Sequence, residues 1–155
     1  MREEQLSSAA EVMRRTIRME RRLQASPDRV SRAWTDAEEL ARWLPLRVEG
    51  TLAEGARTVL VLGGRQTWWE VVEERAGELF VFRCPWLEGD RVVTTVRISI
   101  RRSGYGTALS LEDGPFAVDQ PDGLDAWAAA LARWSEALVM LRAYVDFSVD
   151  VRERW

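Results

Sequence analysis

The chain has 155 residues, of which 46% are hydrophobic and 30% charged, a composition typical of a globular domain with its own core. The net charge of −3 at pH 7 excludes a nucleic-acid binder that relies on a basic surface. No apolar run reaches the roughly 18 residues of a membrane span, and the polar first residues do not resemble a signal peptide. The single cysteine, Cys84, excludes an internal disulfide and favours a cytoplasmic location.

Several residue types are missing, which limits the chemistry available to the chain. Histidine, lysine and asparagine are absent, and all 22 positively charged side chains are arginine. This excludes His-dependent triads, His-ligated metals and lysine Schiff bases. The carboxylates are scattered without the grouping of a metal site. The sequence therefore predicts neither a metal nor another cofactor.

The first part of the chain predicts an arm, a strand and two short helices. Residues 2–14 have the pattern of an amphipathic helix, within an arm over 1–15 that packs on its own domain or contacts a second subunit to form a homodimer. Residues 16–24 alternate as a half-buried strand, although Arg21 falls on the apolar side; it either reaches solvent at the strand end or is a buried charge.

Both short helices have recognisable start signals. Ser26 before Pro27 predicts an N-cap for a helix that runs to about residue 34. Thr35 opens a capping-box pattern for a second helix, which must stop near residue 44 because Pro45 follows.

From residue 46 to 113 the pattern changes to short runs of β-branched and aromatic residues separated by glycine-containing turns. Six strands are predicted, over residues 46–52, 57–62, 66–75, 78–86, 91–101 and 105–113. With the first strand they make a seven-stranded antiparallel sheet. Alternation places Thr94, Val96 and Ile98 on the inner face, and likewise Leu109 and Leu111.

The last predicted element is a helix over residues 122–147, roughly 37 Å long. Asp122 is the expected cap. Apolar residues recur along one face at steps of three and four: Leu124, Trp127, Leu131, Trp134, Leu138, Leu141 and Val145. The element order does not alternate strand and crossover helix, so it predicts an α+β fold in which a curved sheet wraps around the long helix. One domain over 16–150 and a tail over 151–155 are expected.

Four stretches of the chain carry a family resemblance. They are residues 25–43 with Trp34-Thr35-Asp36, residues 78–83, residues 106–111, and residues 134–138 followed by Leu141 and Tyr144. In this order they resemble proteins related to the activator of Hsp90 ATPase, a branch of the START/Bet v 1-like (SRPBCC) superfamily with the helix-grip fold. The resemblance spans about residues 16 to 147. The inward Arg21 and the high tryptophan content depart from the family pattern.

The resemblance implies a cavity between the sheet and the long helix, with its mouth near the short helices. The candidate ligand-binding residues are Trp43, Leu46, Leu60, Leu62, Trp69, Phe80, Phe82, Val96, Leu109, Phe116, Trp127, Leu131 and Trp134. Indole N–H groups among them could orient a ligand oxygen. The alternative is a solid core filled by tryptophan side chains.

Possible polar handles for that cavity are Arg21, Glu70, Glu73 and Arg83. A carboxylate in an apolar cavity would have a raised pKa and could act as an acid or base. Cross-strand Glu–Arg pairs on the solvent face are the competing interpretation. Trp68 shares the face of Glu70, where an arginine stem could cover it. Cys84 has no histidine to activate it, so it is expected to be a small buried apolar residue.

The resulting hypothesis is a non-catalytic protein that binds a small hydrophobic or amphipathic ligand. Lipid binding and a role in the stress response are functions that the resemblance implies. Two alternatives remain open, a cochaperone-like interaction module and a cyclase- or hydrolase-type enzyme that uses the same pocket. No nucleic acid and no membrane span are expected.

Overall fold

The computed structural model describes residues 13–45 and 47–152. Its elements are β1 (Arg14–Leu23), α2 (Pro27–Thr35), α3 (Ala37–Leu40), β2 (Arg47–Glu49), β3 (Arg57–Leu62), β4 (Arg65–Arg75), β5 (Leu79–Trp86), η1 (Glu88–Asp90), β6 (Val92–Ser103), β7 (Gly106–Ala117) and α4 (Pro121–Phe147). All neighbouring strands are antiparallel. The seven strands form one sheet in the order β1-β7-β6-β5-β4-β3-β2.

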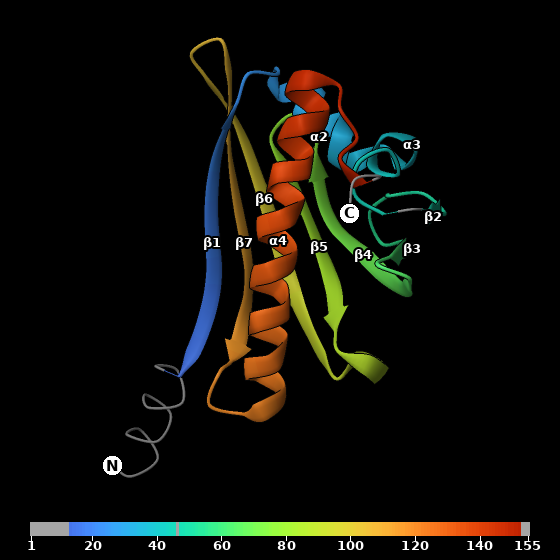
Figure 1. The fold of residues 1–155 in the computed structure, drawn as a ribbon, viewed down its shortest axis with the longest axis vertical. Helices are drawn as coiled ribbons and strands as arrows, with labels where there is room; N and C mark the ends of the chain where they lie inside the picture. The colour runs from blue at the N-terminus through green and yellow to red at the C-terminus, as the bar shows by residue number, and fades with distance from the viewer. Residues whose placement is uncertain (1–12, 46, 153–155) are drawn as a thin grey trace.

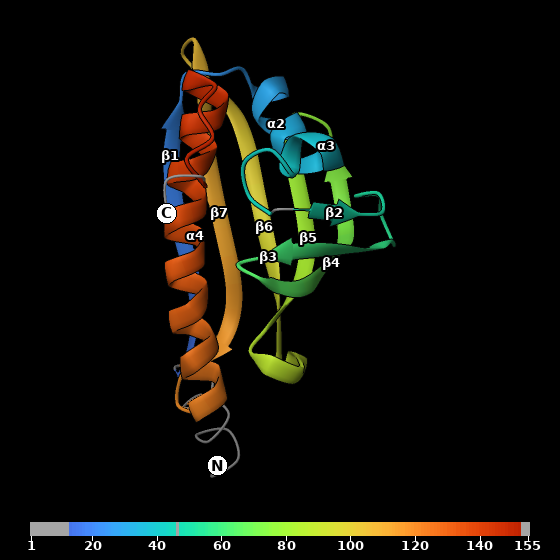
Figure 2. The same ribbon diagram turned by 45° about the vertical axis from the view of Figure 1, so that its right-hand side comes forward.

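The sheet curves around α4, as predicted. Figure 1 shows α4 lying along one face of the long strands, while α2 and α3 sit at one end of the molecule. Figure 2 shows how β2 and β3 turn across the direction of the other strands. This confirms the helix-grip architecture. The predicted helix over residues 2–14 lies outside the described residues, apart from Met13 in a turn and Arg14 at the start of β1.

Most predicted strand limits agree with the structure, with two differences. β2 has only three residues, so the predicted strand over 46–52 is too long. β7 continues four residues beyond the predicted end at Asp113, to Ala117. Pairing of β7 with β1 keeps this extension in the sheet, with Arg14 opposite Ala117. A partner strand therefore extends β7 past the glycine and proline that locally suggest its end.

Of the three predicted helix N-caps, one is confirmed and two are wrong. Ser26 caps α2, accepting a hydrogen bond from the Arg29 N–H at 3.2 Å. In α3 the cap is Asp36, whose carboxylate accepts from the Glu39 N–H at 3.0 Å, so the predicted cap Thr35 is wrong. The Thr35 hydroxyl instead donates to the Ser31 carbonyl at 2.9 Å.

The start of α4 also differs from the expectation. Gln120 is its N-cap, without a side-chain hydrogen bond, and Pro121 occupies the first turn. Asp122 is therefore not the cap. It lies within the first turn, where the helix dipole favours a negative charge.

The predicted apolar face of α4 meets the sheet at Trp134, Leu138 and Leu141, but in the first turns the contact shifts to small residues. Leu124 is 47% exposed, and Trp127 and Leu131 are only half-buried. The buried residues of α4 are Gly123, Ala126, Ala130, Trp134, Ala137, Leu138, Leu141 and Tyr144. Small residues let the helix backbone approach the sheet closely, and large side chains then border this contact. No helix in the described part of the chain, α4 included, is long and apolar enough to cross a membrane.

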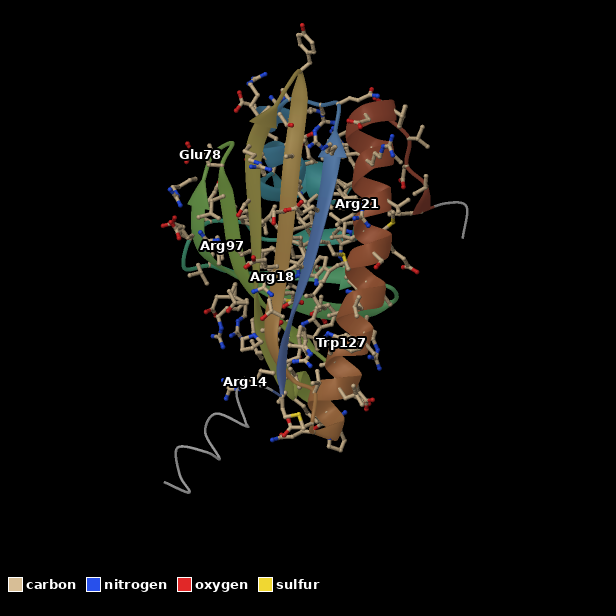
Figure 3. The ribbon with its side chains drawn as sticks, turned by 90° about the vertical axis from the view of Figure 1, so that its left-hand side faces the viewer. Arg14, Arg18, Arg21, Glu78, Arg97 and Trp127 are labelled. Carbon is tan, nitrogen blue, oxygen red and sulfur yellow. The ribbon has the colours of Figure 1, made fainter. Side chains whose placement is uncertain are left out.

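The two faces of the sheet follow the predicted alternation. Val96 and Ile98 are fully buried on the inner face, whereas Arg97 is exposed. Figure 3 shows Arg18 and Arg97 on the outer side of the sheet and Trp127 on the side of α4. β5 is the exception, because its outward residues Leu79 and Val81 are buried as well.

Candidate functional site

Most of the predicted ligand-binding residues form a packed aromatic core. The Trp34 ring lies 4.9 Å from Trp43 and 6.4 Å from both Trp69 and Trp134, measured between ring centroids. Trp69 stacks on Phe82 at 4.0 Å. These contacts are those of a close-packed interior. The Trp34 indole N–H is the one buried side-chain polar atom of the described residues without a hydrogen-bond partner.

The burial of the predicted set agrees with this core position. Ten of its members are buried: Trp43, Leu60, Leu62, Trp69, Phe80, Phe82, Val96, Leu109, Phe116 and Trp134. Trp127 and Leu131 are half-buried, and Leu46 lies outside the described residues. The alternative interpretation, a tryptophan-filled core, therefore fits the centre of the domain around Trp34.

A buried carboxylate, Asp113 on β7, organises the polar part of the interior. It is 0% exposed. Its Oδ1 accepts a hydrogen bond from the Thr94 hydroxyl of β6 at 2.5 Å, and its Oδ2 accepts from the Trp134 indole N–H of α4 at 2.8 Å. Thr94 Oγ1 in turn accepts from the indole N–H of Trp86, the last residue of β5, at 2.9 Å. Hydrogen bonds thus connect three strands with α4 through one buried charge.

The environment of Asp113 changes its acidity. Burial raises its pKa to about 6, and the hydrogen bonds from Thr94 and Trp134 oppose part of this rise. Burial, and next the charge of Asp113, raise the pKa of the Cys84 thiol well above its usual range. Cys84 is therefore a protonated, buried residue at neutral pH, in agreement with its predicted role.

The alternation of residues in β7 indicates that the Asp113 side chain points inward, but the predicted strand limits gave no reason to expect this. Leu109 and Leu111 alternate on the inner face, and Asp113 is the next residue of that parity. Because the predicted strand ended at Asp113, the residue had the appearance of a strand end. Its inward carboxylate becomes evident only when β7 is known to continue.

A pocket of about 370 Å³ opens beside this network, between the β3–β4 turn, the β5–β6 loop and α4. In Figures 1 and 2 these three segments border the same side of the molecule. Its lining residues are Leu62, Arg65, Gln66, Thr67, Pro85, Trp86, Leu87, Glu88, Gly89, Asp90, Ala129 and Arg133. We call it the Trp86 pocket, because Trp86 joins its wall to the buried network. Leu62 is the member of the predicted set that lines it.

The predicted polar handles lie outside this pocket, which corrects the expectation. Glu70 forms ion pairs with Arg57 at 3.2 Å and with Arg83 at 3.8 Å. Glu73 lies 3.4 Å from Arg75. Charged side chains on the outer strand face stay hydrated while pairing across strands. The competing interpretation of solvent-face Glu–Arg pairs is confirmed for Glu70.

Two other predictions concern single residues near the outer surface. Arg21 is exposed, and its guanidinium donates to the Glu20 carbonyl at 2.7 Å. It reaches solvent because β1 is an edge strand, so it is not a buried handle. Trp68 is half-buried, with the Arg57 guanidinium 3.8 Å from its ring centroid, as predicted.

Trp134 is expected to tune the acidity of Asp113, and Trp134→Phe tests this. The substitution removes a donor that favours the ionised carboxylate, so the pKa of Asp113 is expected to rise further above 6. NMR titration of the Asp113 carboxyl carbon measures the change. The control Trp127→Phe removes a half-buried indole from the same helix and should leave the titration unchanged. An unaltered pKa in Trp134→Phe would contradict the role of this hydrogen bond.

Comparison with known proteins agrees with the fold. The model of the family described as Activator of Hsp90 ATPase homolog 1-like protein matches residues 24–146. No curated protein sequence matches the chain significantly.

Similar solved structures include MLL2253 from Mesorhizobium loti, with 22% identity, a TM-score of 0.72, and coverage of 83% of this chain and 94% of that one. The Aha1 dimer from Colwellia psychrerythraea has 14% identity, a TM-score of 0.74, and coverage of 86% and 97%. DynU16, encoded in the dynemicin biosynthetic locus, has 22% identity and a TM-score of 0.73; the match covers 86% of this chain and 48% of DynU16. With the family match over most of its length, the chain belongs to the Activator of Hsp90 ATPase homolog 1-like family.

Proposed function

We propose that the chain binds a small amphipathic ligand in the Trp86 pocket, between the sheet and α4, without catalysing a reaction. The observation that carries this proposal is the pocket itself. Its volume of about 370 Å³ falls within the range of roughly 300–1,000 Å³ that is usual for small-molecule sites. Its lining combines apolar residues with polar and charged ones, as an amphipathic ligand requires.

The wall of the pocket is well supported from beneath. The Trp86 indole donates to Thr94, and the Trp86 ring packs edge-on against Trp134 with 6.0 Å between centroids. A side chain fixed on both sides loses little freedom when a ligand binds. On the helix side, the small residue Ala129 leaves room for the ligand.

The two alternative functions have less support. A catalytic site needs ionisable groups that converge on the ligand. Asp113 is fully buried with both oxygens hydrogen-bonded. Of the two carboxylates that border the pocket, Glu88 and Asp90, the second accepts a hydrogen bond from the Trp68 indole N–H. An interaction module needs a contiguous apolar surface. The large exposed apolar residues of the described chain are spread over the turn before β1, β4, the β6–β7 turn and α4: Met13, Val72, Tyr105, Leu124, Val139 and Phe147.

A blocking substitution tests the proposal. Ala129→Phe places a ring in the Trp86 pocket, and the control Ala128→Phe places the same ring on an exposed neighbouring position. We expect the neutral probe 2-naphthylmethanol to shift the indole N–H resonance of Trp86 in the unmodified protein and in Ala128→Phe. Ala129→Phe is expected to weaken binding by at least about 10-fold, because the added ring occupies the ligand volume. Equal binding by both variants, or no shift in any of the proteins, would refute the proposed site.

A further inference from the structure

One arginine on the wall of the Trp86 pocket lacks the partners that a buried charge normally has. Arg133 of α4 is half-buried, and its guanidinium carbon lies 5.8 Å from the centroid of the Trp86 ring. Burial is the largest influence on Arg133 and lowers its pKa from the ordinary arginine value. A guanidinium taken out of water needs an anion or several acceptors to offset its lost hydration.

The other half-buried arginines of the described chain have such partners. Arg29 forms an ion pair with Glu39. Arg152 pairs with Asp150 at 2.8 Å and donates to two backbone carbonyl oxygens. Within the described residues, Arg133 has neither an ion pair nor a hydrogen bond, and its neighbour is the Trp86 ring. Glu136, three residues along α4, acts on Arg133 through its charge without forming an ion pair. The half-buried guanidinium therefore has no hydrogen-bond acceptor among the described residues, at a place where a ligand can reach it.

We propose that the ligand of the Trp86 pocket carries a single carboxylate, which the Arg133 guanidinium binds. This inference rests on the proposed function and adds the chemical class of the ligand, an apolar body with one carboxylate. The planar guanidinium matches a carboxylate with two parallel N–H···O bonds. Leu62 and Leu87 offer an apolar surface for the rest of the molecule.

The charges around the pocket favour one negative charge on the ligand over two. Glu88 and Asp90 also border the pocket, and the Asp90 carboxylate accepts from the Trp68 indole N–H at 2.8 Å. Their charges would repel a dianion such as a phosphate ester. Arg65 also lines the pocket, so its charged side chains are two arginines and two carboxylates, without the excess positive charge that a dianion needs.

A matched pair of probes tests this inference separately from the proposed function. 2-Naphthoate and 2-naphthylmethanol share the same ring system and differ in charge, and calorimetry measures their affinities. We expect the unmodified protein to bind the carboxylate roughly 10- to 100-fold more tightly, the range expected for a charge-assisted hydrogen-bonded pair. Arg133→Gln should remove this preference, by weakening binding of the carboxylate far more than binding of the alcohol. The control Arg142→Gln removes an exposed charge from the same helix, away from the pocket, and should keep the preference.

The outcomes separate the two proposals. If the unmodified protein binds both probes equally, the carboxylate inference is overturned and the proposed function stands. If Arg133→Gln weakens both probes to the same extent, Arg133 shapes the pocket instead of binding a carboxylate, which also overturns the inference. If neither probe binds, the proposed function itself fails. Comparing two probes on one folded protein keeps the inference testable even if Arg133→Gln is unstable.

Discussion

Replacement of Gly123 by alanine is expected to lower the free energy of unfolding by about 3 kcal/mol. A Cβ atom at position 123 would lie 2.0 Å from the Ala117 carbonyl oxygen and 2.6 Å from its carbon. Both atoms belong to the backbone, so either α4 or the end of β7 must move. In an exposed helix the same substitution would instead stabilise by about 1 kcal/mol. Denaturant titration followed by tryptophan fluorescence measures the difference.

The neighbouring residue provides the control for this experiment. Leu124 belongs to the apolar stripe expected from periodicity, yet it is 47% exposed. Leu124→Ala should therefore change the free energy of unfolding by only about 0.5 kcal/mol. If Leu124→Ala costs more than Gly123→Ala, the first turn of α4 packs Leu124 against the domain, and the close contact assigned to Gly123 is wrong.

Asp113→Asn is expected to abolish a loss of stability of about 1–3 kcal/mol that the unmodified protein undergoes between pH 4 and pH 8. The folded carboxyl has a pKa of about 6, above the value of about 4 for an exposed aspartate. Between pH 4 and pH 6 the folded state therefore holds more protons than the unfolded state. The stability that protonated Asp113 supplies is complete below about pH 4 and is lost as the pH rises through 6. Asparagine is neutral at every pH and does not suffer this loss.

Urea denaturation of both proteins from pH 4 to pH 8 measures the effect. The amide nitrogen of asparagine cannot accept the second hydrogen bond, which lowers the stability of the variant equally at every pH. On top of this constant difference, we expect the unmodified protein to lose stability relative to the variant as the pH increases from 4 to 8. The control Glu112→Gln neutralises the adjacent residue of β7, which pairs with Arg18 on the exposed face. It should change stability by no more than about 1 kcal/mol. A difference in stability between the two proteins that stays constant from pH 4 to pH 8 would contradict the raised pKa of Asp113.

The seven strands and α4 were predictable because they depend on short-range patterns. Alternation in β6 placed Val96 inward and Arg97 outward, and turn residues separated the strands. The Ser26 cap of α2 was also readable, since its partner lies three residues along the chain. Local features of this kind require no knowledge of neighbouring elements.

The site was less predictable, because it depends on residues that meet only after folding. The predicted lining included the bulky apolar side chains, and many of these, such as Trp69 and Phe82, pack against one another. Glu70 was a candidate handle, but its outer-face partners Arg57 and Arg83 come from two neighbouring strands. Arg133 was not predicted at all, because a charged residue in a helix usually indicates the solvent face.

The amino-acid sequence alone determined the order of the elements, the inner and outer faces of most strands, and the resemblance to the family. The tertiary structure alone decided that small residues bring the first turns of α4 against the sheet, and that Asp113 lies between Thr94 and Trp134. The physical reason is that hydrophobic periodicity reports the amount of apolar surface, whereas packing depends on how closely two backbones can approach. At Gly123 a hydrogen atom in place of a side chain permits that approach, and no hydrophobicity scale records it.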